Sequence, residues 1–226
     1  MARIARAVAP GWPHHITQRG NRRMQVFFSD DDYRLYLELM SASCGKLGVE
    51  VWAYCLMPNH VHLIVNPRSE DGLRRAMGDA HRRYSRHVNF REGWRGHLFQ
   101  GRFASFVMDE RYLLAAARYV ELNPVRAGLA DKPWRWKWSS ARAHRRGRDD
   151  ALVTVKPLLD LVGDWQEFLS VPPSEEERNA LRRHERTGRP LGSAAFLTKI
   201  ERALHRMLRP NKPGPKPRAQ PARRKN

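Results

Sequence analysis

Hydrophobic and polar positions alternate with two different periods up to about residue 122. Residues 14–18, 49–55 and 60–66 alternate with a period of two, which predicts strands. Apolar residues recur every three or four positions over 29–48, 70–88 and 110–122, which predicts amphipathic helices. The apolar segment 98–108 contains Gly101 and predicts an interrupted strand. The chain therefore begins as a series of strands and helices.

The order of these elements predicts a fold class. The segments 49–55 and 60–66 flank the turn residues Pro58 and Asn59, as in an antiparallel hairpin. Strand, helix, two strands, helix, strand and helix is the order of a ferredoxin-like α+β sandwich. We therefore expect a ferredoxin-like antiparallel sheet with helices on one face, plus a helical C-terminal extension.

Only helical patterns follow residue 140. Helices are predicted over 156–170, 175–186 and 193–208, with a turn over 187–192. The last two helices could form a helix-turn-helix that reads DNA, or a helical hairpin packed on the main domain. The predicted organisation is a catalytic domain over 1–140, a helical extension that could bind DNA over 141–208, and a disordered basic Pro-rich tail over 209–226.

The net charge of the chain indicates a polyanionic partner. The 226 residues contain 42 Lys and Arg against 23 Asp and Glu, a net charge of +19, and 34 of the cations are Arg. The arginine fork binds phosphate with two hydrogen bonds and stacks on bases, so this excess favours nucleic acid, although a GC-rich genome also enriches Arg. Two cysteines are too few for a zinc ribbon or disulfide framework, and no apolar run is long enough for a membrane span. We expect a cytoplasmic bacterial protein associated with the nucleoid.

His60 and His62 are the first candidates for chemistry. They are separated by one residue on a predicted strand, so both side chains leave the same face of the sheet. That spacing suits two ligands of one metal ion, although an isolated His-x-His pair is more often two surface histidines. Val61 and Leu63 direct the other face to the core. The histidine face is then either solvent-exposed or a site.

Tyr119 and Asn123 form a second candidate pair. They are four residues apart on a predicted helix, so a phenol and an amide would project from one face. The alternative is a core tyrosine and an asparagine that marks the end of the helix before Pro124. Taken alone, this pair favours the structural interpretation.

Four motifs together resemble a known family. The chain closely resembles the REP-associated tyrosine transposases, single-tyrosine transposases of the HUH endonuclease superfamily, over about residues 10–140. The resemblance is carried by GWPHHITQRGNRR (11–23), CLMPNHVHLIV (55–65), HLFQGRFASF (97–106) and RYVELNPVRAGL (118–129), followed by Trp138-Ser139-Ser140. A weaker likeness extends to RTGRPLGSAAF (186–196) and the basic tail.

The resemblance implies an enzyme that cleaves and rejoins single-stranded DNA. By this likeness His60 and His62 bind a divalent metal, Mg²⁺ or Mn²⁺, and Tyr119 is the nucleophile that forms a 5′-phosphotyrosine. Asn123 would complete the coordination, where many related transposases carry Gln. Imidazole ligands would equally accept Zn²⁺. The implied substrate is a hairpin of the repetitive extragenic palindrome (REP) type.

Basic residues near these motifs are candidates for holding DNA. The DNA-binding candidates are Arg19, Arg22, Arg23, Arg82, Arg83 and Arg102, and each could instead be a solvated surface residue. Tyr84 could be a second tyrosine near the site, but its position on an apolar stripe favours core packing. The expected partner is single-stranded hairpin DNA, and the expected state is a monomer or a homodimer.

Two other functions remain open at this stage. One is a non-catalytic, sequence-specific nucleic-acid-binding protein on the same fold. The other is a metal-dependent phosphodiesterase in which Tyr119 is structural and a bound water attacks. Presence of both histidines, Tyr119 and Asn123 in one chain favours catalysis.

Overall fold

The structure is a computed structural model that describes residues 4–210 of the 226. Residues 211–226, most of the basic tail predicted over 209–226, lie outside the described residues. Among the described helices, none combines the length and hydropathy that crossing a bilayer requires.

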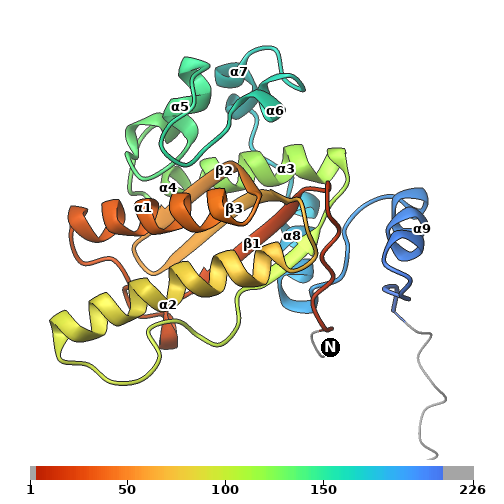
Figure 1. Cartoon of the computed structure of the whole chain (residues 1–226). Helices are drawn as coiled ribbons and strands as arrows, with labels where there is room; N and C mark the ends of the chain where they lie inside the picture. Colours follow the sequence, from red (N-terminus) through yellow and green to blue (C-terminus); the bar gives the residue numbers. More distant parts are fainter. Residues whose placement is uncertain (1–3, 211–226) are drawn as a thin grey trace, which may run out of the picture.

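A four-stranded antiparallel sheet forms the centre of the structure (Figure 1). The strand order is β2-β3-β1-β4, with bounds β1 His14–Arg19, β2 Val49–Met57, β3 His60–Pro67 and β4 Ala104–Val107. The first three strands confirm the predicted segments. The strand predicted over 98–108 is interrupted at Gly101, which adopts a left-handed φ of +58°. The residues after it form the ladder with β1, and before it only an isolated bridge joins Phe99 to Gly20. β1 and β3 are the two central strands.

Helices α1 (Asp30–Lys46) and α2 (Gly72–Glu92) cover one face of the sheet. Ser29 caps α1 by accepting from the backbone N–H of Asp32, whose carboxylate accepts from the N–H of Ser29, as the capping-box spacing predicts. Gly93, at a φ of +65°, ends α2. The core between these helices and the sheet contains the strand residues Val61 and Leu63.

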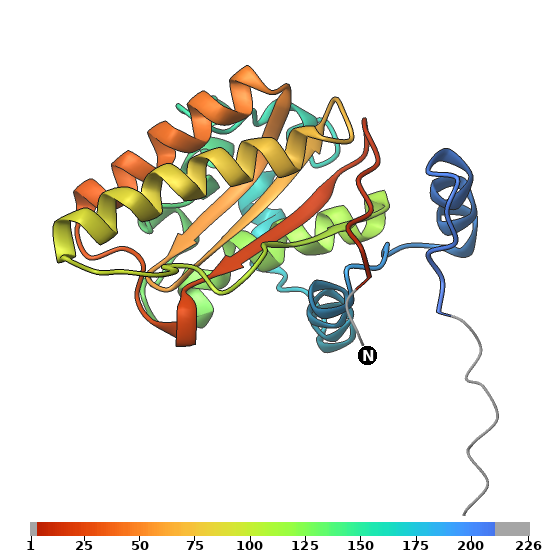
Figure 2. The ribbon, with the colours of Figure 1, turned by 60° about the horizontal axis from the view of Figure 1, so that its bottom comes forward.

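Helices α3 (Glu110–Glu121) and α8 (Glu175–Thr187) lie on the opposite face of the sheet (Figure 2). Small residues of α3, Ala116 and Ala117, pack there with Ile64 of β3 and Phe106 of β4. The α+β class, the antiparallel sheet and the helical extension are confirmed. The expectation placed the helices on one face. α1 and α2 cover that face, whereas α3, predicted over 110–122, lies with α8 on the other, so helices cover both faces.

The C-terminal part is helical, as predicted, but more segmented. Short helices α4 (Asn123–Arg126) and α5 (Ala141–Arg146) follow α3, and the helix predicted over 156–170 is two helices, α6 (Lys156–Leu159) and α7 (Trp165–Ser170). Gly163 lies between them, and Asp164 starts α7 by accepting from two of its backbone N–H groups. Helix α9 (Ala194–Ala203) is shorter than the predicted 193–208 and packs on Ala7 and Ala9. Two 3₁₀ turns, η1 (Asn21–Arg23) and η2 (Pro133–Arg135), complete the elements.

A buried histidine makes the stability of this fold depend on pH. His14 Nδ1 donates to the Trp12 carbonyl oxygen at 2.8 Å, and its Nε2 accepts from the Ala9 N–H at 3.1 Å, so the neutral ring is fully paired. Burial lowers the pKa of His14 from 6.5 to about 4. Between these values the unfolded chain binds a proton that the folded chain does not, so the fold loses stability as pH falls through this window.

We expect the free energy of unfolding, measured by urea titration, to decrease as pH is lowered from 6.5 to 4. In His14→Gln, which cannot titrate, the slope should be shallower by up to about 1.4 kcal/mol per pH unit, the value for one proton. An unchanged slope in the variant would contradict this role of His14.

Candidate active site

A basic cavity of about 1050 Å³ lies on the α3–α8 side of the sheet, next to the ends of β1 and β3. It contains three of the four proposed chemical residues, namely His60, Tyr119 and Asn123. The other lining residues are Thr17, Gln18, Arg19, Arg23, Gln100, Arg102, Ala104, Arg126, Asn179, Arg182, Arg183, Glu185 and Arg186. Such a concentration of guanidinium groups suits a phosphate-rich ligand.

The pairing of β1 with β3 positions the histidines. His60 lies opposite Arg19 and His62 opposite Thr17. Because side chains alternate along a strand, both imidazoles leave the α3–α8 face, while Val61 is fully buried on the other. The two rings have centroids 4.9 Å apart. His60 borders the cavity and His62 is buried behind it.

Both histidines are neutral at physiological pH. Burial, together with the nearby cations Arg19 and Arg126, lowers the pKa of His60 from 6.5 to about 4. Burial also holds the pKa of His62 well below 6.5, with His60, His15 and the same arginines adding to the effect. Neutral imidazoles have a free lone pair, so protons do not compete with a metal ion for these ligands.

Neighbouring groups fix the orientation of each ring. His60 Nδ1 donates to Asn59 Oδ1 at 2.6 Å, which makes Nε2 the nitrogen with the lone pair. His62 Nδ1 lies 3.1 Å from Nε2 of His15, on β1, and these two rings stack nearly parallel. Burial lowers the pKa of His15 to about 3, so this ring is neutral too. His15 Nδ1 is buried without a hydrogen-bond partner.

Glu185 brings a carboxylate from α8 into the same cluster. Its Oε1 accepts from the Thr17 hydroxyl at 3.1 Å and lies 3.8 Å from Nδ1 of both His15 and His62. Burial raises the pKa of Glu185, against the opposite effects of the Thr17 hydrogen bond and the surrounding arginines. Donor atoms of His15, His62 and Glu185 lie within 4.8 Å of one another, a distance compatible with a shared cation.

Sequence reasoning missed His15 and Glu185. The signal for His15 was available, because His15 and Thr17 share a strand face by the same alternation that relates His60 to His62. No comparable signal existed for Glu185. Glu185 is one of several charged residues on a polar helix. It lies 168 residues after Thr17 in the sequence, and only the tertiary fold brings the two side chains together.

Tyr119 lies close to both the histidines and a cation. Only 5% of its surface is exposed, and its ring centroid is 5.6 Å from that of His62. The guanidinium carbon of Arg126 lies 4.4 Å from the centre of the Tyr119 ring. This distance is within the range of a cation–π contact. Arg126, which also lines the cavity, was not among the residues that the sequence indicated.

Asn123 is held by the same arginine. α3 ends at Glu121, and Asn123 begins the separate helix α4 before Pro124. Its Oδ1 accepts from Arg126 Nη2 at 2.9 Å, and its Nδ2 is buried without a partner. The Asn123 amide therefore lines the cavity even though α3 ends before it, and its oxygen accepts a hydrogen bond from Arg126.

A buried carboxylate anchors the helix that carries Tyr119. Glu121 is completely buried and accepts from the Ser140 hydroxyl, His144 Nδ1 at 2.7 Å and Trp165 Nε1 at 2.8 Å. Ser140 belongs to the Trp138-Ser139-Ser140 motif, and its hydroxyl oxygen also accepts from the backbone N–H of Tyr54 at 2.9 Å. These contacts connect the end of α3 to β2, α5 and α7, which restricts movement of Tyr119 relative to the sheet.

The predicted DNA-binding arginines fall into two groups. Arg19, Arg23 and Arg102 line the cavity, whereas Arg22 is exposed in η1 outside its lining. Arg82 and Arg83 lie on α2, on the opposite side of the sheet, and pair with Asp79. The structure therefore does not bring Arg82 and Arg83 to the cavity.

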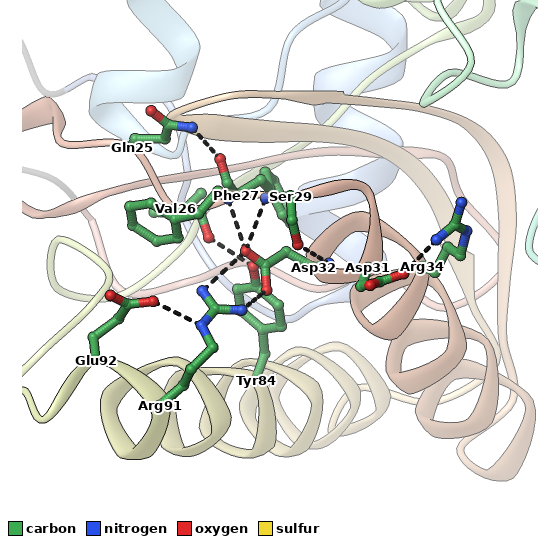
Figure 3. A network of polar contacts seen from close by, with 11 residues as sticks. Gln25, Val26, Phe27, Ser29, Asp31, Asp32, Arg34, Tyr84, Arg91 and Glu92 are labelled. Carbon is green, nitrogen blue, oxygen red and sulfur yellow. Dashed lines mark hydrogen bonds and ion pairs between the residues drawn. The ribbon is translucent and has the colours of Figure 1, made fainter.

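Tyr84 belongs to the core, as its position on the apolar stripe favoured. It is fully buried, and its hydroxyl donates to the Val26 carbonyl oxygen at 2.6 Å (Figure 3).

Comparisons with known proteins agree with this architecture. The structure of a REP-associated tyrosine transposase bound to a REP hairpin aligns with a TM-score of 0.56 at 19% identity, covering 68% of this chain and 92% of that one. A proposed transposase from Deinococcus radiodurans R1 aligns with a TM-score of 0.38 at 20% identity, covering 53% of this chain and 95% of that one. Comparison with curated proteins finds no significant match.

The sequence itself matches a family model. Residues 11–123, half of the chain, match the model of the IS200-like transposases. The matched range contains both central strands and ends at Asn123. The chain therefore belongs to the IS200-like transposase family.

Proposed function

We propose that this protein is a metal-dependent transposase and endonuclease that cleaves and rejoins single-stranded DNA through a 5′-phosphotyrosine on Tyr119. The observation that carries the proposal is the convergence of Tyr119, His60 and Asn123 on one arginine-lined cavity, with His62 in ring contact with Tyr119 and His60. The family supports the reaction class. The relative bound to a REP hairpin supports a hairpin as the substrate.

The donor set fits a divalent metal. Asn59 fixes His60 so that Nε2 is free to bind, and the His15 contact occupies Nδ1 of His62. The buried Asn123 amide nitrogen has no partner, so the amide can rotate or shift when its oxygen is recruited. We assign His60, His62 and Asn123 as ligands and Mg²⁺ or Mn²⁺ as the ion. When bound, the ion would polarise an oxygen of the scissile phosphate and offset its developing charge.

The residues of the chain perform the remaining steps. The Tyr119 oxygen attacks phosphorus, a Tyr–O–P bond forms, the P–O3′ bond breaks, and the 3′ oxygen leaves as a hydroxyl with the proton that the phenol releases. Arg126 stabilises the phenolate that this attack requires. Arg19, Arg23 and Arg102 hold the DNA backbone. The phosphotyrosine retains the bond energy, so a 3′-OH can reverse the reaction and rejoin strands without ATP.

We place His15 and Glu185 behind the metal ligands as positioning residues. In the tautomer that suits metal binding, His62 Nδ1–H donates to His15 Nε2, and His15 Nδ1–H faces the Glu185 carboxylate at 3.8 Å. Outer partners of this kind orient a ligating imidazole and increase its basicity. The series of contacts from His62 through His15 to Glu185 then makes helix α8 part of the metal site.

The first test uses a labelled single-stranded hairpin DNA with Mn²⁺. The wild type should form a protein-linked DNA band on a denaturing gel, and Tyr119→Phe and the double variant His60→Ala/His62→Ala should lose it by at least about a hundredfold. Arg82→Ala, on the far side of the sheet, serves as the control and should keep it.

Other outcomes of this test identify the alternatives. Cleavage that persists in Tyr119→Phe indicates a water nucleophile and a phosphodiesterase. Tight binding of several hairpins without any cleavage indicates a non-catalytic binding protein.

A second test addresses the positioning residues through metal binding alone. We expect His15→Gln and Glu185→Gln to weaken Mn²⁺ binding by about 10- to 100-fold, measured by titration calorimetry on the full chain. Glu176→Gln removes an exposed carboxylate from the same helix and should bind Mn²⁺ like the wild type. Wild-type affinity in both His15 and Glu185 variants would refute their role.

A further inference from the structure

Exposed aromatic side chains gather at the C-terminal end of α2, away from any core. Phe90 is 91% exposed, and Phe28 and Trp94 are each 40% exposed. The Phe28 and Trp94 rings are in edge-to-face contact with centroids 5.7 Å apart, and Arg91 lies over Phe28. We call Phe28, Phe90 and Trp94 the aromatic platform. Removing these rings from water by contact with a ligand would lower the free energy, so a group of exposed rings is a candidate binding site.

The segments that carry the platform are tied together rigidly (Figure 3). The Asp32 carboxylate accepts from the backbone N–H of Phe28 at 2.7 Å and at the same time pairs with Arg91. The Tyr84 hydroxyl donates to the carbonyl oxygen of Val26, two residues before Phe28. The backbone that carries Phe28 is therefore joined to the end of α2 before any ligand binds, which reduces the entropy lost on binding.

The loop that carries Phe28 also leads to the candidate active site. Asn59 donates to the Arg23 carbonyl oxygen at 3.1 Å while accepting from His60 Nδ1, so one residue joins this loop to a proposed metal ligand. Gly20 permits the loop to fold back, because a Cβ there would lie 2.2 Å from the Met24 carbonyl oxygen. Arg19 and Arg23, at the start of the loop, line the cavity. The loop thus runs from the cavity towards the platform.

Two arginines in this loop adopt an unusual backbone conformation. Arg22 and Arg23 have φ values of +51° and +63°, which is strained for residues with a Cβ. The strain is tolerated at the turn that directs Arg23 into the cavity lining and leaves Arg22 in solvent. Arg95 follows Trp94 and is also exposed. Arginine side chains therefore lie both in the loop that leaves the cavity and next to Trp94.

We propose that the aromatic platform stacks unpaired bases of the DNA strand whose phosphate is held in the cavity. Aromatic rings combined with a positively charged path are the arrangement by which proteins bind single strands, because every base offers a flat face for stacking. The charge, and the loop that joins Phe28 to the cavity residues Arg19 and Arg23, favour a nucleic-acid strand over a protein partner. This inference rests on the proposed function and adds a binding site outside its chemistry.

The test separates base stacking from phosphate binding. The probe is a fluorescein-labelled DNA hairpin with an unpaired flank, compared with the same hairpin whose flank is abasic and keeps only sugar and phosphate. We expect the full-length wild type to bind the base-containing flank about tenfold more tightly by fluorescence anisotropy. Phe90→Ala and Trp94→Ala should lose most of that preference and bind the abasic probe like the wild type.

Two further variants control for apolar contact and for fold. Phe90→Leu keeps apolar volume without a ring and should behave like Phe90→Ala, whereas Phe90→Tyr should retain the preference. Met207→Ala removes an exposed apolar side chain elsewhere and should change nothing. Phe90 is almost entirely solvent-exposed, so its replacement does not disturb the core.

Several results would overturn the platform. The wild type could bind both probes equally, or the variants could lose the same affinity on both probes. In sedimentation, Phe90→Ala could dissociate a dimer, and this result would assign the rings to an interface with a second copy of the chain. Failure of the proposed function is separately visible, as the absence of a protein-linked DNA band in the wild type. Variants of the platform should still form that band at saturating DNA.

Discussion

The candidate site depends on one constraint, the register in which the two central strands pair. With Thr17 opposite His62 and Arg19 opposite His60, the β1 and β3 side chains at the candidate site are the histidines, Thr17 and Arg19. Val61 and Leu63 fill the other face, against α1 and α2. A shift of one residue would place the imidazoles in that core and the apolar residues in the cavity. The hydrophobic core and the candidate site are therefore two consequences of one pairing.

Segments far from the sheet in sequence supply the remaining parts of the candidate site. Glu121 anchors the tyrosine helix through Ser140, His144 and Trp165, so residues beyond the matched family segment hold Tyr119 in place. Glu185 enters from α8 and accepts from Thr17. The helical C-terminal part packs on the second face of the sheet and contributes directly to the cavity. The aromatic platform is carried by α2 and by the loop before α1, and the chain over 19–28 connects it to the cavity residues Arg19 and Arg23.

Local patterns predicted most of the fold and part of the site's polar groups. Alternation along 60–66 correctly put His60 and His62 on one face, and helical spacing brought Tyr119 and Asn123 to one cavity. The helix predicted over 156–170 is divided at Gly163 because capping by Asp164 starts a new helix. Glu185 and the Glu121 network could not be predicted, since their partners lie far away in sequence and only packing brings them together.

The central claim is that the Tyr119 oxygen becomes bonded to DNA. The most direct measurement is mass spectrometry of the protein after reaction with a short single-stranded hairpin and Mn²⁺, followed by nuclease and trypsin digestion. The account predicts that the peptide 119–126 carries a nucleotide linked through a 5′-phosphate to Tyr119. An unmodified 119–126 peptide together with cleaved DNA that has a free 5′-phosphate would contradict it.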